Sequence, residues 1–190
     1  MVMVALRTGL RLGELLGLDW NAVDLEHRRL TVRASLVRGI LGSPKSNRIR
    51  HVPLTLDACS ALAQIGPASG YVFVDPKGGP LTKAKASHAL AKLSQAAGLG
   101  SIGWHPLRHT FASQLAMAAV PLPAIRELLG HSSITVTMRY AHLSPSTLIA
   151  AVEVLDGRKD RQFAQPAVNL VEPLPIAVAT QALGSGLNPS

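Results

Sequence analysis

The hydrophobic pattern of this chain changes abruptly near residue 157. Before that point, short segments with helical spacing alternate with strand-like segments, and Gly or Pro separates them. Residues 157–190 are instead rich in Pro, Ala and Val, and Pro166, Pro173 and Pro175 exclude a long helix there. We therefore expect one folded domain over residues 1–156, followed by a flexible tail over residues 157–190.

The short segments of the first 156 residues predict a mainly α-helical fold with a small antiparallel β-sheet, an α+β fold. Apolar residues at helical spacing predict helices over 10–17, 55–65, 82–97, 107–119, 123–129, 133–140 and 145–155. Alternating polar and apolar residues predict strands over 29–37 and 48–54, with a turn over 39–43, and residues 71–74 are predicted as a short strand or an extended segment. The first two strands would pair as an antiparallel ribbon.

Basic residues outnumber acidic ones, and the excess lies in the predicted domain. The chain has 19 Lys+Arg and 11 Asp+Glu, a net charge of +8, and residues 1–156 hold 16 and 9 of these, a net charge of +7. This balance points to a polyanionic partner, with nucleic acid as the first expectation. Aromatic residues make up only 4% of the chain, which argues against a base-stacking platform for single strands.

Several functional classes are excluded by what the chain lacks. Cys59 is its single cysteine, so neither an internal disulfide nor a cysteine-rich zinc site can form. The His and acidic residues lack zinc-ligand spacing, and no GxxxxGK[ST] nucleotide loop occurs, so we expect no metal and no cofactor. The apolar stretch at residues 1–18 contains Arg7, Arg11 and Glu14 and is too charged to span a bilayer. We expect a soluble intracellular protein.

Four separated motifs contain residue types that suit chemistry on a phosphate group. Each motif alone occurs by chance in many helices, so the inference depends on their combination. They are Thr8–Leu15 (TGLRLGEL), His105–Ser113 (HPLRHTFAS), Leu128–Ser133 (LLGHSS) and Thr137–His142 (TMRYAH).

Two arginines and two histidines in these motifs could stabilise the transition state of DNA strand cleavage. When a side chain attacks a phosphodiester, negative charge develops on the non-bridging oxygens of a pentavalent phosphorus. The guanidinium groups of Arg11 and Arg108 would offer rigid forks of donors to that charge. His105 precedes Arg108 by three residues, which places both on one helix face, and His131 would project from the turn after a helix stop.

A tyrosine and a lysine could supply the nucleophile and the proton donor. A phenol has a pKa of roughly 10, so Tyr140 needs a base or a strongly positive pocket before it can attack. The 5′-oxygen leaving group needs a proton, which Lys45 could deliver from the tip of the ribbon.

The order and spacing of the four motifs resemble those of the tyrosine recombinase (phage integrase) family. The resemblance implies that Tyr140 is the nucleophile of a 3′-phosphotyrosine link and that Arg11 and Arg108 bind the phosphate. It also implies a general acid–base role for His105 and a second phosphate contact for His131.

The same resemblance extends to the hairpin and to the partners. It implies that Lys45 is the hairpin lysine and that Glu14 orients an arginine. It implies double-stranded DNA as partner and a homo-tetramer on paired sites, with a monomer in the absence of DNA as the alternative, in the cytoplasm at the nucleoid. Family members carry a further N-terminal domain that clamps DNA, so we expect an N-terminally truncated catalytic domain. Residues 145–155 would pack on a neighbouring subunit or fold back.

Each site residue also has a structural interpretation. Arg11 could be a solvated helix residue, His105 an N-terminal helix cap, and Tyr140 a core aromatic with its hydroxyl at the rim. We interpret His109 and His142 as structural or surface residues.

The leading hypothesis is a site-specific recombinase or integrase that cuts and rejoins DNA through a phosphotyrosine. An alternative from another class is a catalytically silent DNA-binding or regulatory fragment. A third is a phosphatase-like or topoisomerase-like enzyme that uses the same pocket.

Overall fold

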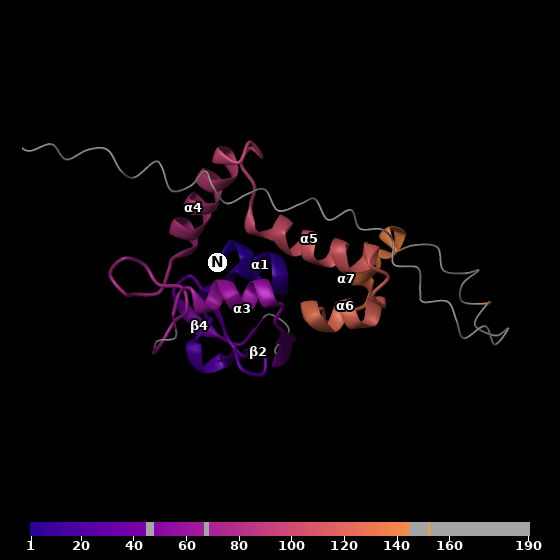
Figure 1. The fold of residues 1–190 in the computed structure, drawn as a ribbon, viewed down its shortest axis with the longest axis horizontal. Coiled ribbons are helices and arrows are strands. Elements are labelled where there is room, and N and C mark those ends of the chain that lie inside the picture. The colour runs from indigo at the N-terminus through magenta and orange to yellow at the C-terminus, as the bar shows by residue number, and fades with distance from the viewer. Residues whose placement is uncertain (45–47, 67–68, 145–151, 153–190) are drawn as a thin grey trace, which may run out of the picture. The chain divides into compact units, whose positions relative to one another are not determined.

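The computed structural model describes residues 1–44, 48–66, 69–144 and 152 (Figure 1). Apart from Val152, these residues belong to a compact unit that spans Met1–Thr147. The helices are α1 (Val2–Thr8), α2 (Leu12–Leu16), α3 (Leu56–Ala63), α4 (Lys83–Ala96), α5 (Trp104–Met117), α6 (Leu122–Leu129) and α7 (Thr135–Met138), with 3₁₀ turns η1 (Trp20–Ala22) and η2 (Ala141–Leu143). The strands are β1 (Val23–Asp24), β2 (Arg29–Val32), β3 (Ser35–Val37), β4 (Ile40–Gly42) and β5 (Arg50–Pro53). The predicted fold class, mainly helical with a small antiparallel sheet, is confirmed.

The predicted antiparallel ribbon is confirmed between β2 and β5. These strands pair with Leu30 opposite Val52, and β1 adds to the other edge of β2. Leu30 and Val52 are fully buried, because the sheet presents this face to α1 and α3 in the larger core. Thr55 caps α3, its hydroxyl accepting from the amide of Ala58.

The single long strand predicted over residues 29–37 is wrong, and so is the turn over 39–43. The chain leaves the sheet after β2, and β3 and β4 form a separate hairpin. Its two turn residues, Arg38 and Gly39, both have positive φ, which is the geometry of the tightest hairpin turns. This hairpin packs on α2 at Gly17, where a Cβ would lie 3.0 Å from the backbone nitrogen of Leu36.

The helix predicted over residues 10–17 is broken at its start. An unpredicted helix, α1, ends at Gly9, which adopts the left-handed conformation (φ 63°), and α2 begins only at Leu12. Arg11 therefore lies at an extended corner between two helices (φ −70°, ψ 152°) instead of inside one.

Two other predicted elements differ in extent, and residues 71–74 take the second of their two predicted forms. They are an extended segment with isolated bridges only, from Tyr71 to Asp19 and from Val74 to Pro80. The predicted helix over 133–140 is reduced to α7. Helix α5 begins three residues earlier than predicted, at Trp104, because Gly103 is its N-cap. The predicted helix over 145–155 and the domain boundary at 156 lie outside the described residues, except for Val152.

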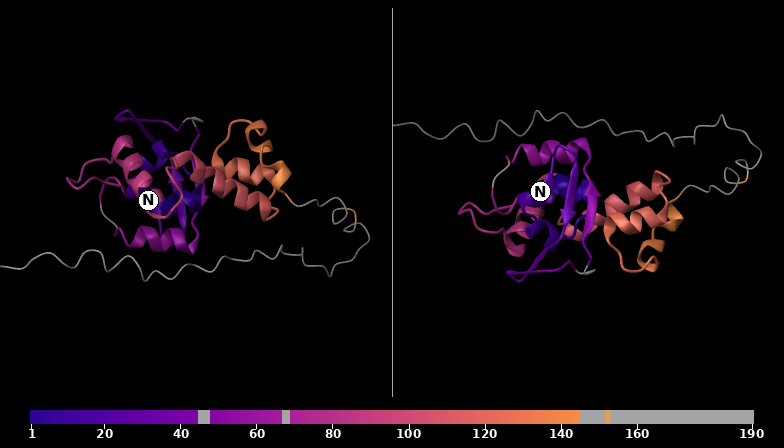
Figure 2. Two further views of the ribbon diagram at one scale, coloured as in Figure 1. Left: turned by 90° about the horizontal axis from the view of Figure 1, so that it is seen from above. Right: turned by 90° about the horizontal axis from the view of Figure 1, so that it is seen from below.

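Helix α5 links two hydrophobic clusters. Its N-terminal part contributes Leu107 to the larger cluster that contains α1, α3 and the sheet. Its C-terminal part packs against α6 in a smaller cluster formed by Ala112, Ala116, Ile125, Leu129 and Tyr140. Figures 1 and 2 show α5 running from the indigo and purple elements to the orange ones. Among the described residues, no helix has the length and apolar character needed to cross a membrane.

Candidate active site

Three arginines from three different elements converge on the C-terminal end of α6. Helix α6 ends at Gly130, whose left-handed conformation (φ 64°, ψ 45°) leaves the last carbonyl groups outside the helix hydrogen-bond ladder. The three donor–acceptor pairs are Arg50 Nε to the Leu128 carbonyl at 3.0 Å, Arg108 Nη2 to that of Leu129 at 2.6 Å, and Arg11 Nη2 to that of Gly130 at 3.3 Å. The partial negative charge of this helix end thus holds three cations together.

Arg11 is held by Glu14 as well as by α6. The Glu14 carboxylate accepts from the Arg11 backbone amide at 2.9 Å and from Arg11 Nη1 at 3.0 Å. These contacts form a capping box at the N-terminus of α2. The expectation that Glu14 orients an arginine is therefore confirmed, although the partly buried Arg11 is not the only arginine on this carboxylate.

Arg50 is the second partner of Glu14 and was not among the predicted site residues. Its Nη1 and Nη2 donate to Oε1 and Oε2 of Glu14 at 3.0 and 2.7 Å, and the side chains are 7% and 1% exposed. Burial alone would raise the pKa of Glu14, but the hydrogen bonds and charges of Arg50 and Arg11 outweigh it and hold that pKa below its ordinary value. Glu14 is therefore ionised at neutral pH.

A sequence signal could have found Arg50. In a strand, alternate residues face the same side, so counting back from Leu54 and Val52 places Arg50 on the core face. Ile49, the apolar residue directly before Arg50, lies on the opposite face of the chain and is exposed to solvent. An arginine on the buried face of a strand needs a carboxylate partner, and Glu14 supplies it.

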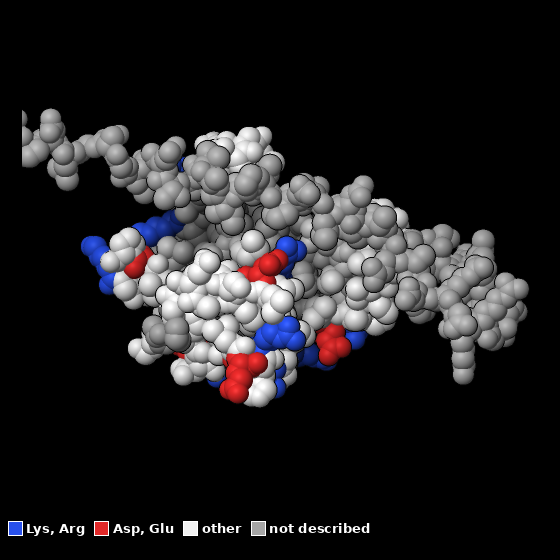
Figure 3. Space-filling view, in the orientation of Figure 1, with Lys and Arg blue, Asp and Glu red and all other residues white. Residues whose placement is uncertain are grey.

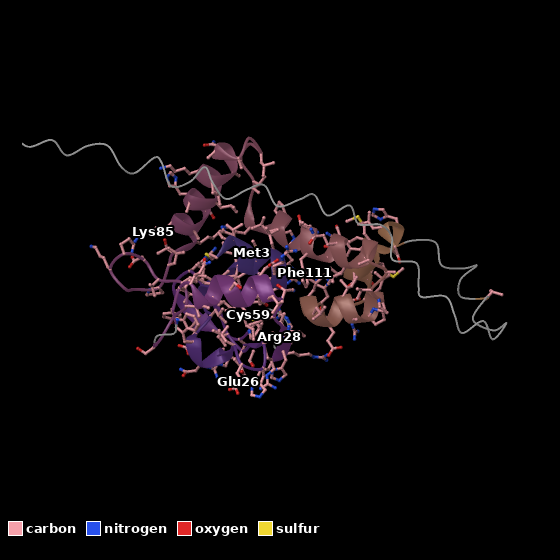
Figure 4. The ribbon with its side chains drawn as sticks, viewed as in Figure 1. Met3, Glu26, Arg28, Cys59, Lys85 and Phe111 are labelled. Atoms are coloured by element: carbon pink, nitrogen blue, oxygen red, sulfur yellow. The ribbon has the colours of Figure 1, made fainter. Side chains whose placement is uncertain are left out.

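Arg108 bridges the ends of two helices. Its Nη1 donates to the Gly9 carbonyl at the end of α1, at 2.6 Å, and its Nη2 donates to α6 as described above. Gly9 is confined by Phe111, labelled in Figure 4, because a Cβ on Gly9 would lie 2.4 Å from the Phe111 ring. Burial lowers the pKa of Arg108 to about 9, aided by the charge of Arg11, so the guanidinium is still protonated at neutral pH.

A cavity of about 310 Å³ lies over this arginine cluster. Of the six predicted site residues, five line it, and the sixth, Lys45, lies outside the described residues. The lining residues are Arg11, His105, Arg108, His109, Gly130, His131, Ser132, Val136, Arg139 and Tyr140. A cavity of this composition suits an anion. On the face shown in Figure 3, by contrast, Lys and Arg are scattered among Asp and Glu.

His131 projects from the turn after α6, as predicted. Its Nδ1 lies 2.9 Å from the hydroxyl of Thr137, which is buried in α7. Burial lowers the pKa of His131 to about 4, and the positive charges of Arg108, Arg11 and Arg139 act in the same direction. The ring is therefore neutral at neutral pH and can offer one N–H to a ligand in the cavity.

Tyr140 follows α7, and its ring is part of the smaller core. It is 5% exposed and packs in the cluster with Ala112 and Leu129. Its hydroxyl lies 2.5 Å from Nδ1 of His109. Burial raises the pKa of Tyr140, while the charges of Arg139 and Arg108 lower it to a smaller extent. The core and active-site interpretations of this residue are thus compatible, because the ring is packed and the residue still lines the cavity.

The two histidines of α5 lie side by side. The rings of His105 and His109 meet edge to face, with centroids 4.5 Å apart. The interpretation of His105 as a helix cap is wrong, because the N-cap is Gly103. His109, interpreted from sequence as structural or at the surface, lines the cavity instead. Its position four residues after His105 was the available signal, since such residues share a helix face.

Arg139 is a third residue that sequence reasoning missed. It directly precedes Tyr140 and lines the cavity. His142, in η2, is exposed and outside the cavity lining, in agreement with its interpretation as a surface residue. Among the described residues, no group of three or more His, Cys, Asp or Glu side chains is placed to hold a metal ion.

Comparison with known proteins places this arrangement in a family. Residues 1–147 match the phage integrase family. Tyrosine recombinase XerC of Xylella fastidiosa (strain 9a5c) is 39% identical over 142 residues, which cover 72% of this chain and 45% of that protein. The catalytic domain of bacteriophage HP1 integrase is 27% identical with a TM-score of 0.63, covering 85% of this chain and 83% of that one.

A further structural neighbour is the XerH site-specific recombinase bound to its difH substrate in a pre-cleavage complex. It is 26% identical, with a TM-score of 0.61 over 82% of this chain and 45% of that one. This chain spans about half the length of the curated relatives that it matches. Since the family match covers residues 1–147 and the solved relatives share the fold, the chain belongs to the phage integrase family of tyrosine recombinases.

Proposed function

We propose that this chain cuts and rejoins double-stranded DNA through a 3′-phosphotyrosine link on Tyr140, as part of a site-specific recombinase or integrase. The observation that carries the proposal is that Tyr140 lines the same cavity as Arg11 and Arg108. A nucleophile and two phosphate-binding groups thus lie around one space large enough for a phosphate group. The XerH neighbour, a site-specific recombinase bound to its difH substrate, supports DNA as the substrate.

The phosphate would bind between the arginines. A guanidinium has five N–H donors, so the two carbonyl bonds of Arg108 leave donors for the non-bridging oxygens of a phosphate. Arg11 keeps donors in the same way, because Glu14 and Gly130 engage only part of its fork. As negative charge builds on those oxygens during attack, both cations stabilise the transition state more than the ground state.

The histidines and the hairpin lysine would complete the reaction. Neutral His131 donates one N–H to a phosphate oxygen, and His105, exposed on the same helix face as Arg108, exchanges protons with the reacting phosphate. Lys45 gives a proton to the departing 5′-oxygen. The phosphotyrosine conserves the energy of the broken phosphodiester, so rejoining needs no nucleotide cofactor.

Membership of the family implies the partners. The substrate is double-stranded DNA at the nucleoid in the cytoplasm, and the assembly is a homo-tetramer that pairs two sites. The predicted division into a catalytic domain over 1–156 and a tail over 157–190 is kept as part of the proposal. Because this chain spans about half of its relatives, the silent DNA-binding fragment is the alternative that the experiment must exclude.

A covalent capture experiment tests the proposal. The protein is incubated with a library of nicked duplexes that release a short fragment after cleavage, so that the phosphotyrosine cannot be resealed. We expect a protein–DNA adduct that survives denaturation and disappears in Tyr140→Phe. Tyr71→Phe is the matched control, since it removes the other tyrosine of the chain. DNA binding without an adduct would support the silent fragment instead.

A further inference from the structure

The hydroxyl of Thr137 does not bond to its own helix, as the hydroxyls of helical threonines commonly do. The hydroxyls of Thr8 and Thr110 donate to the carbonyl four residues earlier, within α1 and α5. Helix α7 has only four residues, so the residue four positions before Thr137 lies outside it. Among the described residues, the one hydrogen-bond partner of the Thr137 hydroxyl is Nδ1 of His131, at 2.9 Å.

The burial of Thr137 decides which atom donates in this contact. The residue is 0% exposed, so bulk water cannot accept its hydroxyl proton. A buried hydroxyl that donates to nothing carries the full cost of its desolvation. If Nδ1 of His131 donated, the proton of Thr137 would have no acceptor within the part of the chain that the structure describes. The hydroxyl therefore donates, and Nδ1 is the unprotonated nitrogen.

This contact determines the tautomer of His131. Burial and the surrounding arginines keep the ring neutral at neutral pH, and a neutral imidazole carries one N–H. Since Nδ1 is unprotonated, that proton is on Nε2. The two nitrogens point to different sides of the ring, and Nδ1 is turned towards the buried Thr137. Nε2–H is therefore the group that His131 offers to the cavity that it lines with Arg11 and Arg108.

We propose that Thr137 is a positioning residue that holds His131 in the Nε2–H tautomer, so that the ring donates to a phosphate oxygen beside Arg11 and Arg108. This inference rests on the proposed function, which makes the cavity a phosphate site. In the other tautomer, Nε2 would present a lone pair, which repels the negatively charged oxygens of a phosphate. Thr137 thus determines whether the ring of His131 attracts the substrate or repels it.

Main-chain hydrogen bonds hold the partners of this contact in place. The amide of His131 donates to the carbonyl of Arg126 in α6 at 3.1 Å. The amide of Tyr140 donates to the carbonyl of Thr137 at 3.0 Å. Thr137 is therefore bonded to His131 through its side chain and to the proposed nucleophile through its main chain. A displacement of α7 would move the hydroxyl that orients His131 together with the nucleophile.

The tautomer can be measured in the free protein. Nitrogen NMR chemical shifts distinguish a protonated ring nitrogen from an unprotonated one, and the signals of His131 are identified by their loss in His131→Ala. We expect unprotonated Nδ1 and protonated Nε2 in the wild type and in Thr137→Ser, which keeps the hydroxyl. In Thr137→Val, which has a similar shape but no donor, we expect signals of both tautomers. Protonated Nδ1 in the wild type would overturn the inference, as would a wild-type spectrum in Thr137→Val.

The consequence for DNA cleavage is tested by the single-turnover rate of adduct formation at saturating DNA. Loss of the hydrogen bond should lower this rate roughly tenfold in Thr137→Val, and Thr137→Ser should retain most of it. The matched control is Thr135→Val, which changes an exposed threonine of the same helix outside the cavity lining. In a His131→Ala background, Thr137→Val should add no further loss, because Thr137 acts through His131. A merely structural role would lower the rate equally in both backgrounds.

The outcomes distinguish this inference from the proposed function. If the wild type forms an adduct and Thr137→Val forms it at the same rate, or loses the same factor in both backgrounds, Thr137 is not a positioning residue and the proposed function stands. If the wild type forms no adduct on any duplex, the proposed function fails, while the NMR measurement still decides the tautomer. If Thr137→Val does not fold, protonated Nδ1 in the wild-type spectrum still overturns the inference.

Discussion

Glu14 and Arg50, which are 36 residues apart in sequence, form a bidentate ion pair with donor–acceptor distances of 3.0 and 2.7 Å. The pair joins α2 to β5, and Arg50 also donates to α6 through its Nε. Three elements that are distant in sequence therefore meet at the buried guanidinium of Arg50. The position of Arg11, which shares the Glu14 carboxylate, depends on this pair.

Arg50→Met should destabilise the fold strongly. Removing one partner of a buried ion pair typically costs about 3–5 kcal/mol, and because Arg11 still pairs with Glu14, we expect a loss at the lower end of that range. Urea unfolding should show this decrease, while Arg48→Met, at an exposed position two residues earlier, should change stability little. The double variant Glu14→Gln with Arg50→Met should recover part of the loss. Equal effects of the two arginine substitutions would contradict the structure.

The fold should lose stability in acid through Glu14. The pKa of Glu14 is lowered in the folded protein, so the unfolded chain binds a proton at higher pH than the folded one. The contribution of Glu14 is fully present above its ordinary pKa of 4.5 and is lost as pH falls below that value. Unfolding free energies measured in urea between neutral pH and acid should decrease more steeply for the wild type than for Glu14→Gln.

Gly130→Ala should be more harmful than a comparable glycine substitution elsewhere. A Cβ on Gly130 would lie 2.9 Å from Nη1 of Arg50, at a φ of +64°. Gly100 has a similar φ of +67°, but nothing lies within 4 Å of its Cβ position. Gly100→Ala should cost about 1 kcal/mol for backbone strain, and Gly130→Ala about 1–3 kcal/mol more. Denaturant unfolding of both variants measures the difference, and equal losses would rule out the close approach of Arg50.

His131 should remain neutral well into the acid range. Its pKa is lowered to about 4 by burial and by the surrounding arginines, so the ring of the free protein should not titrate near 6.5. Between pH 6.5 and 4 the unfolded chain binds a proton at His131 and the folded chain does not, so the free energy of unfolding falls as the pH decreases through this range. NMR titration of the ring protons checks the value. Titration near 6.5 would show that the ring lies outside the cavity in solution.

Lys45→Ala should impair cleavage of ordinary DNA but not of DNA with a better leaving group. A 5′-thiol departs without help from an acid, so adducts should form normally with a substrate that carries a bridging sulfur. The comparison of adduct rates on the two substrates isolates the proton donor. If Lys45→Ala reacts normally with both, the lysine assignment is incorrect.

The elements that local patterns govern were predictable from the sequence. Period-two alternation identified the β2–β5 ribbon, and the spacing of His105 and Arg108 placed them on one helix face. The corner at Arg11 was missed because Leu10 and Leu12 continue an apolar spacing that resembles one helix. The chain turns there because Gly9 ends α1 in the left-handed conformation and packs against Phe111.

Contacts between distant segments were the part that sequence could not provide. The role of Arg50 depends on Glu14, and that of His109 depends on Tyr140, which is 31 residues away. Local patterns indicate which face of an element is buried, but they do not identify the partner. His109 lay inside a recognised motif, whereas Arg50 lay in a predicted strand outside the four motifs.

The acceptors at the end of α6 are main-chain carbonyls, and this has a consequence for how the pocket tolerates sequence change. Every residue type carries the same carbonyl, so substitutions at 128 and 129 that keep the helix preserve the anchors of Arg50 and Arg108. A deletion or insertion within α6 would instead rotate all the anchors by about 100°. At the positions of this helix outside the core, a change of side chain should therefore be tolerated better than a change of helix length.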